Sequence, residues 1–398
     1  MDSSLEEAAL VLKTSRRRMM WKITAPLVLP GIMSTIILVF SSAMGSFATS
    51  QFLGLPVRYY VLTTEMYKSL TGTNPGYGYV IALIMILLSF AIMMVNQKVI
   101  GTRKSYTTVT GKSSSLSLFR LKSLRTPISV LMLIFILLIT VVPLITFAVE
   151  SLITVQGDYS LSNFSLKYWI EKDLALADGV LVNSEVWLSL KNTIILSICC
   201  AVGAGTLGCL GGYAVVRRWG SKLSTTVNNL MFIPYLIPSM ALSAIFLSMF
   251  SERRGPIPAL YGTFLLLVII GTIKYLPLAS RSGINSMFQI SHEIEESAVI
   301  MGISWWKRMT HILIPIQKSS IISGYLLPSI SCMRELELFV LLYTPSSVIL
   351  TTMLFQYSSK GFDQYANALT LIIILIIMLL NYLVNKITGA SIEKGVGG

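Results

Sequence analysis

Residues 296–315 have the sequence Glu-Ser-Ala-Val-Ile-Met-Gly-Ile-Ser-Trp-Trp-Lys-Arg-Met-Thr-His-Ile-Leu-Ile-Pro and lie directly ahead of a long apolar run. A related stretch occupies residues 7–26, also ahead of an apolar run. Subtracting 289 from the later residue numbers matches Glu296 to Glu7, Ala298 to Ala9, Ile312 to Ile23 and Pro315 to Pro26. A polar loop that recurs in this way predicts a repeated docking site.

The composition of the chain is that of a membrane protein. Of its 398 residues, 54% are hydrophobic and 12% charged, and the mean hydropathy is +0.73. Soluble domains carry about 25% charged residues. Apolar runs of about 20 residues, the length that crosses a bilayer as a helix, recur along the sequence. Short alternating segments typical of barrel strands are missing, so we expect an all-α integral membrane protein, because helices satisfy their backbone groups internally.

The distribution of charge indicates a membrane topology rather than binding to nucleic acid. The net charge is +13, but the positive residues concentrate in loops that flank apolar runs. The four cysteines, Cys199, Cys200, Cys209 and Cys332, all lie inside apolar segments. Thiols in such positions usually pack as small apolar groups, so we expect no disulfide framework.

Eight membrane spans are expected, at residues 28–52, 79–99, 127–150, 189–216, 225–250, 260–280, 318–343 and 364–384. The linker at residues 100–126 is basic and has no acidic residue, so the positive-inside rule places it in the cytoplasm. Alternation of the spans then places both termini and the 281–317 loop in the cytoplasm, and the mainly acidic 151–188 loop outside. Both copies of the repeated loop fall on the cytoplasmic side.

The repeated pattern is Glu-x-Ala, three residues, Gly, nine residues and Ile-x-x-Pro, and it resembles the cytoplasmic loop of ABC-type importer permeases. In that family the loop forms short helices that dock on the ATPase subunit. Small residues permit close helix approach, glycine permits a left-handed turn, and tryptophans offer contact area typical of binding hot spots. The resemblance implies that the ATPase-docking residues are Glu7, Ala8, Ala9, Glu296, Ser297, Ala298, Gly302, Trp305 and Trp306.

Further segments resemble the ferric-iron permease branch of that family, in which two permease halves are fused. These segments are Arg334-Glu335-Leu336, Leu341-Leu342-Tyr343-Thr344-Pro345 and the linker stretch Thr107-Thr108-Val109-Thr110-Gly111-Lys112. Within the chain, Val61-Leu62-Thr63-Thr64 is similar to Ile349-Leu350-Thr351-Thr352. The resemblance implies the type I ABC importer permease fold.

The chain departs from the family pattern in two ways. Residues 127–386 are expected to form a complete six-helix second half, with a core at 188–384 and a cytoplasmic tail at 387–398. Residues 1–99 are expected to supply only the coupling loop and last two helices of the first half, so about four spans would be lacking upstream of Met1, through a misplaced start, a split gene or decay. In addition, Lys13 occupies the position of Gly302, where a left-handed turn would cost about 1 kcal/mol or more.

Three ionisable residues, Arg334, Glu335 and Glu337, interrupt the expected seventh span. Such residues inside a membrane are candidates for function, and we expect them to line the translocation pathway. Arg334 and Glu337 are spaced to pair on one helix face, so a structural ion pair is the alternative, as is a span that ends earlier. Lys274 is expected to extend its amine toward the cytoplasmic interface.

The sequence shows no catalytic constellation, no metal-ligand pattern around His292 or His311, and no cofactor motif. The resemblance implies partners: a cytoplasmic ABC ATPase, as a dimer; an extracytoplasmic substrate-binding protein; and a companion chain for the lacking helices. The implied function is binding-protein-dependent import of ferric iron across the inner membrane. Open alternatives are import of thiamine, polyamine or phosphonate, an ATPase-independent secondary transporter, or a non-functional fragment.

Overall fold

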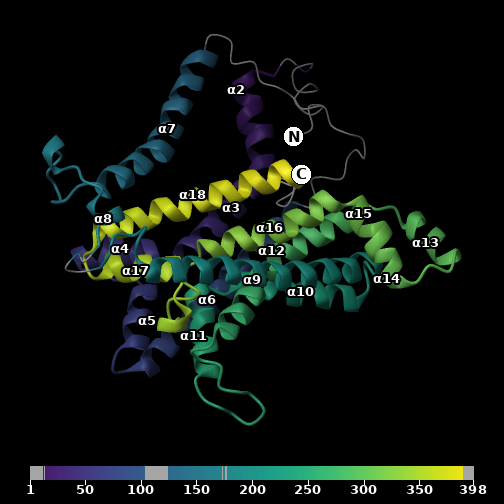
Figure 1. The fold of residues 1–398 in the computed structure, drawn as a ribbon. Helices are drawn as coiled ribbons and strands as arrows, with labels where there is room; N and C mark the ends of the chain where they lie inside the picture. The colour runs from purple at the N-terminus through teal and green to yellow at the C-terminus, as the bar shows by residue number, and fades with distance from the viewer. Residues whose placement is uncertain (1–11, 13, 104–123, 173, 175–176, 389–398) are drawn as a thin grey trace. The chain divides into compact units, whose positions relative to one another are not determined.

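The computed structural model describes residues 12, 14–103, 124–172, 174 and 177–388. These residues form helices joined by turns and loops, with two isolated β-bridges, Ile153 to Phe164 and Arg254 to Ile257 (Figure 1). The all-helical fold expected from the sequence is confirmed.

The chain divides into two compact units, one of residues 1–46 and 84–143 and one of residues 47–83 and 144–398. The described start of the first unit comprises α2 (Arg16–Met19), the π-helical turn η1 (Met20–Thr24) and α3 (Ala25–Gly45). Two helices continue from one unit into the other, α6 (Pro75–Arg103) and α7 (Arg125–Glu150). The second unit holds α4 (Ala48–Gly54), η2 (Leu55–Val57), α5 (Leu62–Thr71), η4 (Leu161–Asn163), α8 (Lys167–Ile170), α9 (Ser184–Arg217), α10 (Lys222–Leu236), α11 (Ser239–Phe250), α12 (Phe264–Phe288), α13 (His292–Ile300), α14 (Trp305–Arg308), η5 (Met309–Leu313), α15 (Ile314–Ile316), α16 (Lys318–Met333), η6 (Pro345–Ser347), α17 (Leu350–Ser359) and α18 (Asp363–Thr388).

Five helices in the described part of the chain are long and apolar enough to cross a membrane, or up to seven spans if each of two bent helix pairs counts as one. The five are Pro75–Asn96, Arg125–Glu150, Ser184–Arg217, Phe264–Phe288 and Asp363–Leu383. They agree with five of the eight expected spans. Two more expected spans, at 28–52 and 225–250, are each interrupted by a break between helices.

The expected span at 318–343 differs from the structure, in which α16 ends at Met333. Directly after the end of the helix, the Glu335 Oε1 accepts a hydrogen bond from the Leu338 N–H at 3.1 Å. A side-chain acceptor three residues before a free N–H acts as a helix N-cap and starts a new turn. The ionisable residues Arg334, Glu335 and Glu337 follow directly after this position, and a span that ends earlier was one of the alternatives that the sequence left open.

The break between α10 and α11 is a bend of 101° at Pro238. Proline has no N–H, so the carbonyl of Pro234 loses its helical partner. The Lys274 Nζ on α12 donates to the carbonyl of Ile237 at 2.7 Å and to that of Pro234 at 3.5 Å. Lys274 therefore supplies hydrogen bonds to the carbonyls that lack a partner at the helix break. The expectation that its amine extends to the cytoplasmic interface was wrong.

The core of the second unit is built around α9, which packs against α12 and α16. The close approach to α12 depends on two glycines of α9 in the pattern Gly208-x-x-x-Gly212. A Cβ on Gly208 would lie 2.6 Å from the Ala279 carbonyl carbon, and one on Gly212 would lie 2.5 Å from that of Gly283. Small residues at such interfaces let helix backbones meet.

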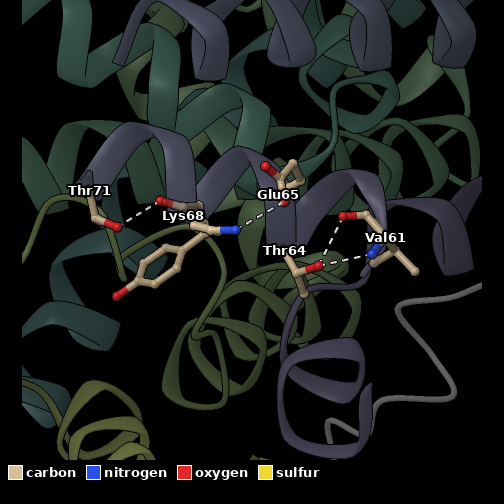
Figure 2. A network of polar contacts seen from close by, with 6 residues as sticks. Val61, Thr64, Glu65, Lys68 and Thr71 are labelled. Atoms are coloured by element: carbon tan, nitrogen blue, oxygen red, sulfur yellow. Dashed lines mark hydrogen bonds and ion pairs between the residues drawn. The ribbon is translucent and has the colours of Figure 1, made fainter. Parts of the chain in front are cut away.

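The repeat is visible in local structure as well as in sequence. Thr64 Oγ1 accepts from the Val61 N–H and donates to the Val61 carbonyl, both at 2.9 Å, at the start of α5 (Figure 2). Thr352 makes the same pair of bonds with Ile349 at the start of α17, at 3.1 and 2.9 Å. The similar sequences at residues 61–64 and 349–352 therefore encode the same helix start.

We expect Gly208→Leu to lower the free energy of unfolding by about 3 kcal/mol or more, because a leucine would force α9 and α12 apart. This change is measured by thermal unfolding in detergent, with the fraction of monodisperse protein at each temperature as the signal. Leu207→Ile is the matched control, because Leu207 is 51% exposed on the same helix. Equal melting temperatures for the two variants would contradict the close packing of α9 on α12.

Candidate functional site

The segment from Ser291 to Gln317, between α12 and α16, contains the second copy of the repeated motif, and we call it the α13–α14 loop. Figure 1 shows α13 and α14 at the opposite end of the second unit from α8 and α17. The Ser291 side chain caps α13 by accepting from the Glu293 N–H at 3.2 Å. Glu293 and Glu295 in the first turn add acidic charge where the helix dipole favours it.

Gly302 turns the chain between α13 and α14. Its φ is +71°, in the left-handed region, and the following Ile303 N–H donates to the Ala298 carbonyl at 3.0 Å. This is the helix-ending geometry that favours glycine. The expected left-handed turn at Gly302 is confirmed.

The two tryptophans of α14 point into different environments. The Trp305 ring packs edge-on against Tyr213 of α9, with ring centroids 6.0 Å apart. Trp306 is 69% exposed. Trp305 therefore helps to hold the loop on the membrane helices, and only Trp306 is free to contact another protein.

The outer side of the α13–α14 loop exposes apolar side chains beside an acidic one. Ile300 is 86% exposed and Met301 is 77% exposed, and Val299, Glu296 and Trp306 are also exposed. We call these five residues the tip surface. A group of exposed apolar side chains is typical of a surface that binds another protein. The sequence analysis missed Val299, Ile300 and Met301, although their place between Glu296 and Gly302 could have suggested them.

The inner side of α13 is anchored through Ala298 and Glu295, which are 4% and 8% exposed. Glu295 Oε1 accepts a hydrogen bond from the Tyr213 hydroxyl at 2.6 Å. Its carboxylate forms ion pairs with Arg217 at the end of α9 and with Arg308 of α14, the latter at 3.6 Å. Helical spacing places Glu295 on the face of Ala298, a signal that could have identified it from the sequence.

The expected docking residues therefore lie in different places. Glu296, Ser297 and Gly302 are exposed, Ala298 is buried, and Trp305 is half-buried. Glu7, Ala8, Ala9 and Lys13 lie outside the described residues. From Arg16 onward the first copy matches the second, because α2, η1 and the first residue of α3 lie 289 positions before α14, η5 and the first residue of α15.

The expected pathway residues take part in the fold. Glu335 Oε2 accepts from the Tyr275 hydroxyl at 2.9 Å, and Glu337 Oε1 accepts from the Phe47 N–H at 2.6 Å. Arg334 is exposed, and no ion pair joins it to Glu337 in the described structure. The two residues do not share a helix, because α16 ends at Met333. Their role in a pathway stays a prediction.

Glu337 joins the two sequence repeats beside a cluster of aromatic rings. The ring centroid of Phe47 lies 4.9 Å from that of Tyr67 and 5.7 Å from that of Phe355. Phe52 packs on Phe355 at 6.0 Å. Phe47 and its neighbours in the first repeat are thus fixed to the second repeat by apolar packing on Phe355 of α17 and by the hydrogen bond to Glu337.

Residues 1–106 and 204–392 match the protein family described as the binding-protein-dependent transport system inner membrane component. The chain belongs to this family. Its members are membrane permeases, in agreement with the apolar helices described above.

Relatives from two transport systems resemble this permease. The ferric transport system permease protein FbpB of Actinobacillus pleuropneumoniae is 24% identical over 384 residues, which cover 94% of this chain and 53% of the relative. A Salmonella typhi protein, provisionally named as the 2-aminoethylphosphonate transport system permease protein PhnV, is 24% identical over 63% of this chain and 89% of its own length. The chain spans about half the length of the ferric permeases it matches.

Solved structures support the same fold for the permease. A chain of a bacterial alginate ABC transporter, crystallised with an alginate pentasaccharide-bound periplasmic protein, aligns with a TM-score of 0.52 at 14% identity. The alignment covers 67% of this chain and 96% of that chain. The type I importer permease fold expected from the sequence is confirmed.

We expect the order of tolerance at position 302 to be Gly, Asn, Ala and then Val. No neighbouring atom lies within 4 Å of a Cβ built at this position. The φ angle, rather than crowding, therefore determines how much free energy a substitution costs. Alanine in the left-handed region costs about 1–2 kcal/mol, and asparagine adopts it more readily. Hydrogen exchange of the 297–306 peptide measures local opening, and equal exchange in Gly302→Asn and Gly302→Val would contradict this assignment.

We expect Glu337→Ala to destabilise the permease by about 1–3 kcal/mol, because the Phe47 N–H would lose a charged acceptor. Arg334→Ala is the control, since its side chain is exposed, and its stability should change by less than about 0.5 kcal/mol. Thermal unfolding in detergent distinguishes the two. Equal losses would show that the bond from Phe47 does not hold the fold.

Proposed function

We propose that this chain is the membrane-spanning permease of an ABC importer and that its substrate is ferric iron. The observation that carries the proposal is the α13–α14 loop, which combines a buried anchor with an exposed apolar tip surface. Family membership supports the importer, and the ferric permease relative that matches 94% of the chain supports iron.

In this proposal the tip surface docks on a cytoplasmic ABC ATPase dimer, which hydrolyses ATP in place of the chain itself. The 7–26 loop forms a second contact of the same kind, and both termini are cytoplasmic. A substrate-binding protein delivers iron at the opposite end of the second unit, where α8 lies (Figure 1). ATP-driven movement of the docking loops then alternates access to a path through the permease.

The proposal also assigns the parts of the chain. Residues 127–386 act as one permease half, with its core at 188–384, and residues 1–99 as part of the other half, joined by the basic linker at 100–126. Arg334, Glu335 and Glu337 lie close to the line where the halves meet. There the carboxylates of Glu335 and Glu337 accept hydrogen bonds from backbone N–H groups and a hydroxyl, and not from Arg334.

Deletion of the gene in its native host is expected to reduce uptake of radiolabelled ferric iron to background under iron limitation, and the cloned gene should restore it. The matched uptake of radiolabelled 2-aminoethylphosphonate should not change. Lost phosphonate uptake with normal iron uptake would support the second candidate substrate, which is favoured by the relatives matched over 89% of their length.

Docking is tested with a variant on the tip surface. Ile300→Asp should leave the amount of chain in the membrane unchanged, because the Ile300 side chain is 86% exposed and contributes little to packing within the permease. It should retain much less ATPase on affinity purification than Ile300→Leu, the matched control. Unchanged ATPase retention in Ile300→Asp would show that the tip surface is not the docking site. Lost ATPase retention with unchanged iron uptake would instead point to an ATPase-independent transporter.

A further inference from the structure

Two acidic neighbours in α13 occupy opposite environments. Glu296 is exposed on the tip surface, whereas Glu295 is 8% exposed and enclosed by Tyr213, Arg217 and Arg308. The docking motif contains Glu296, and nothing in the proposed docking role requires Glu295 to be buried.

The carboxylate of Glu295 balances two cations. The side chains of Arg217 and Arg308 are 11% and 16% exposed, so both guanidiniums lie mostly out of water. The buried Arg217 Nε, Nη1 and Nη2 atoms have no hydrogen-bond partner among the described residues, although Nε forms the ion pair with Glu295. A buried charge that loses its counter-ion is strongly unfavourable. The Glu295 charge therefore contributes to holding α13, α14 and α9 together, beside the packing of Trp305 on Tyr213.

Helix α9, which carries Arg217 at its end, can connect this cluster rigidly to the distant end of the second unit. α9 has 34 residues, which corresponds to a length of about 50 Å, and its glycines hold it closely on α12. Far from Arg217, the Asn192 side chain donates to the Val348 carbonyl, and Thr193 accepts from the Leu350 N–H, both at 2.9 Å.

The segment reached by α9 is the one that contains Glu335 and Glu337. The Thr351 hydroxyl donates to the Glu335 carbonyl at 2.7 Å, and Glu337 accepts from Phe47. Bonded contacts thus extend from the α13–α14 loop along α9 to the place where the two repeats meet. A rigid element with bonded partners at both ends can carry a displacement between distant sites.

The cluster belongs to the second repeat. The same offset of 289 matches Glu295 to Glu6, but it matches Arg308 to Met19. The first copy therefore lacks the arginine that closes the cluster from α14.

We propose that Glu295 is a positioning residue that ties the α13–α14 loop to α9, so that movement of the docked loop moves this helix. The inference rests on the proposed function, because the movement is supplied by the docked ATPase. It separates two roles within one motif: Glu296 contacts the partner, and Glu295 transmits the displacement.

The test compares Glu295→Gln with Glu296→Gln, which remove the same charge from adjacent positions. In the full chain in nanodiscs, without ATPase, hydrogen exchange of the 292–313 peptide should rise about tenfold in Glu295→Gln and stay unchanged in Glu296→Gln. In the purified complex, Glu295→Gln should keep its ATPase but transport less ferric iron per ATP hydrolysed. Glu296→Gln should instead retain less ATPase.

A charge-swapped variant guards against simple misfolding. Glu295→Arg combined with Arg308→Glu keeps one acidic and two basic groups in the cluster, and it should recover iron transport per ATP relative to Glu295→Arg alone. Equal exchange in Glu295→Gln and Glu296→Gln, or normal transport per ATP in Glu295→Gln, would overturn the role of Glu295. If the unmodified chain retained no ATPase, the proposed function would fail first, and the exchange comparison would still decide whether Glu295 holds the loop to α9.

Discussion

Within a bilayer every backbone N–H and carbonyl needs a partner from the protein itself, and this constraint explains three ionisable side chains of the second unit. The permease has helix breaks at Pro238, at Met333 and between Gly45 and Ala48. At each break an ionisable side chain supplies the lost bond: Lys274 donates to free carbonyls, Glu335 caps the turn after α16, and Glu337 accepts from Phe47. Broken helices are tolerated at these positions because ionisable side chains form hydrogen bonds with the backbone groups there.

The repeat provides the same local structures twice but uses them unequally. The π-helical turns and the threonine-capped helix starts recur at matching positions. In contrast, Glu337 matches Ala48 and Arg308 matches Met19. The ionisable side chain that links the two repeats, and the one that links the loop to its helix, thus each occur in one copy only. Under the proposed function, this asymmetry assigns different mechanical roles to the two permease halves.

The α13–α14 loop combines, in one short motif, a buried side and the exposed side that we propose for docking. Helical periodicity sends Ala298 and Glu295 inward and Glu296, Val299 and Ile300 outward. The glycine at position 302 then redirects the chain, so that α14 adds Trp305 to the buried side and Trp306 to the exposed side. Anchoring and docking are therefore separated by residue, which makes each testable alone.

The sequence by itself determined the all-helical membrane class, five of the spans, the family and the left-handed turn at Gly302. These features depend on local composition and spacing, because hydropathy, glycine and motif residues act through the nearby chain. Only the tertiary structure decided the end of α16, the partner of Lys274 and the burial of Glu295. Each of these depends on a side chain that meets groups distant in sequence, such as Tyr213 with Glu295 or Phe47 with Glu337, and one sequence does not specify which distant groups meet.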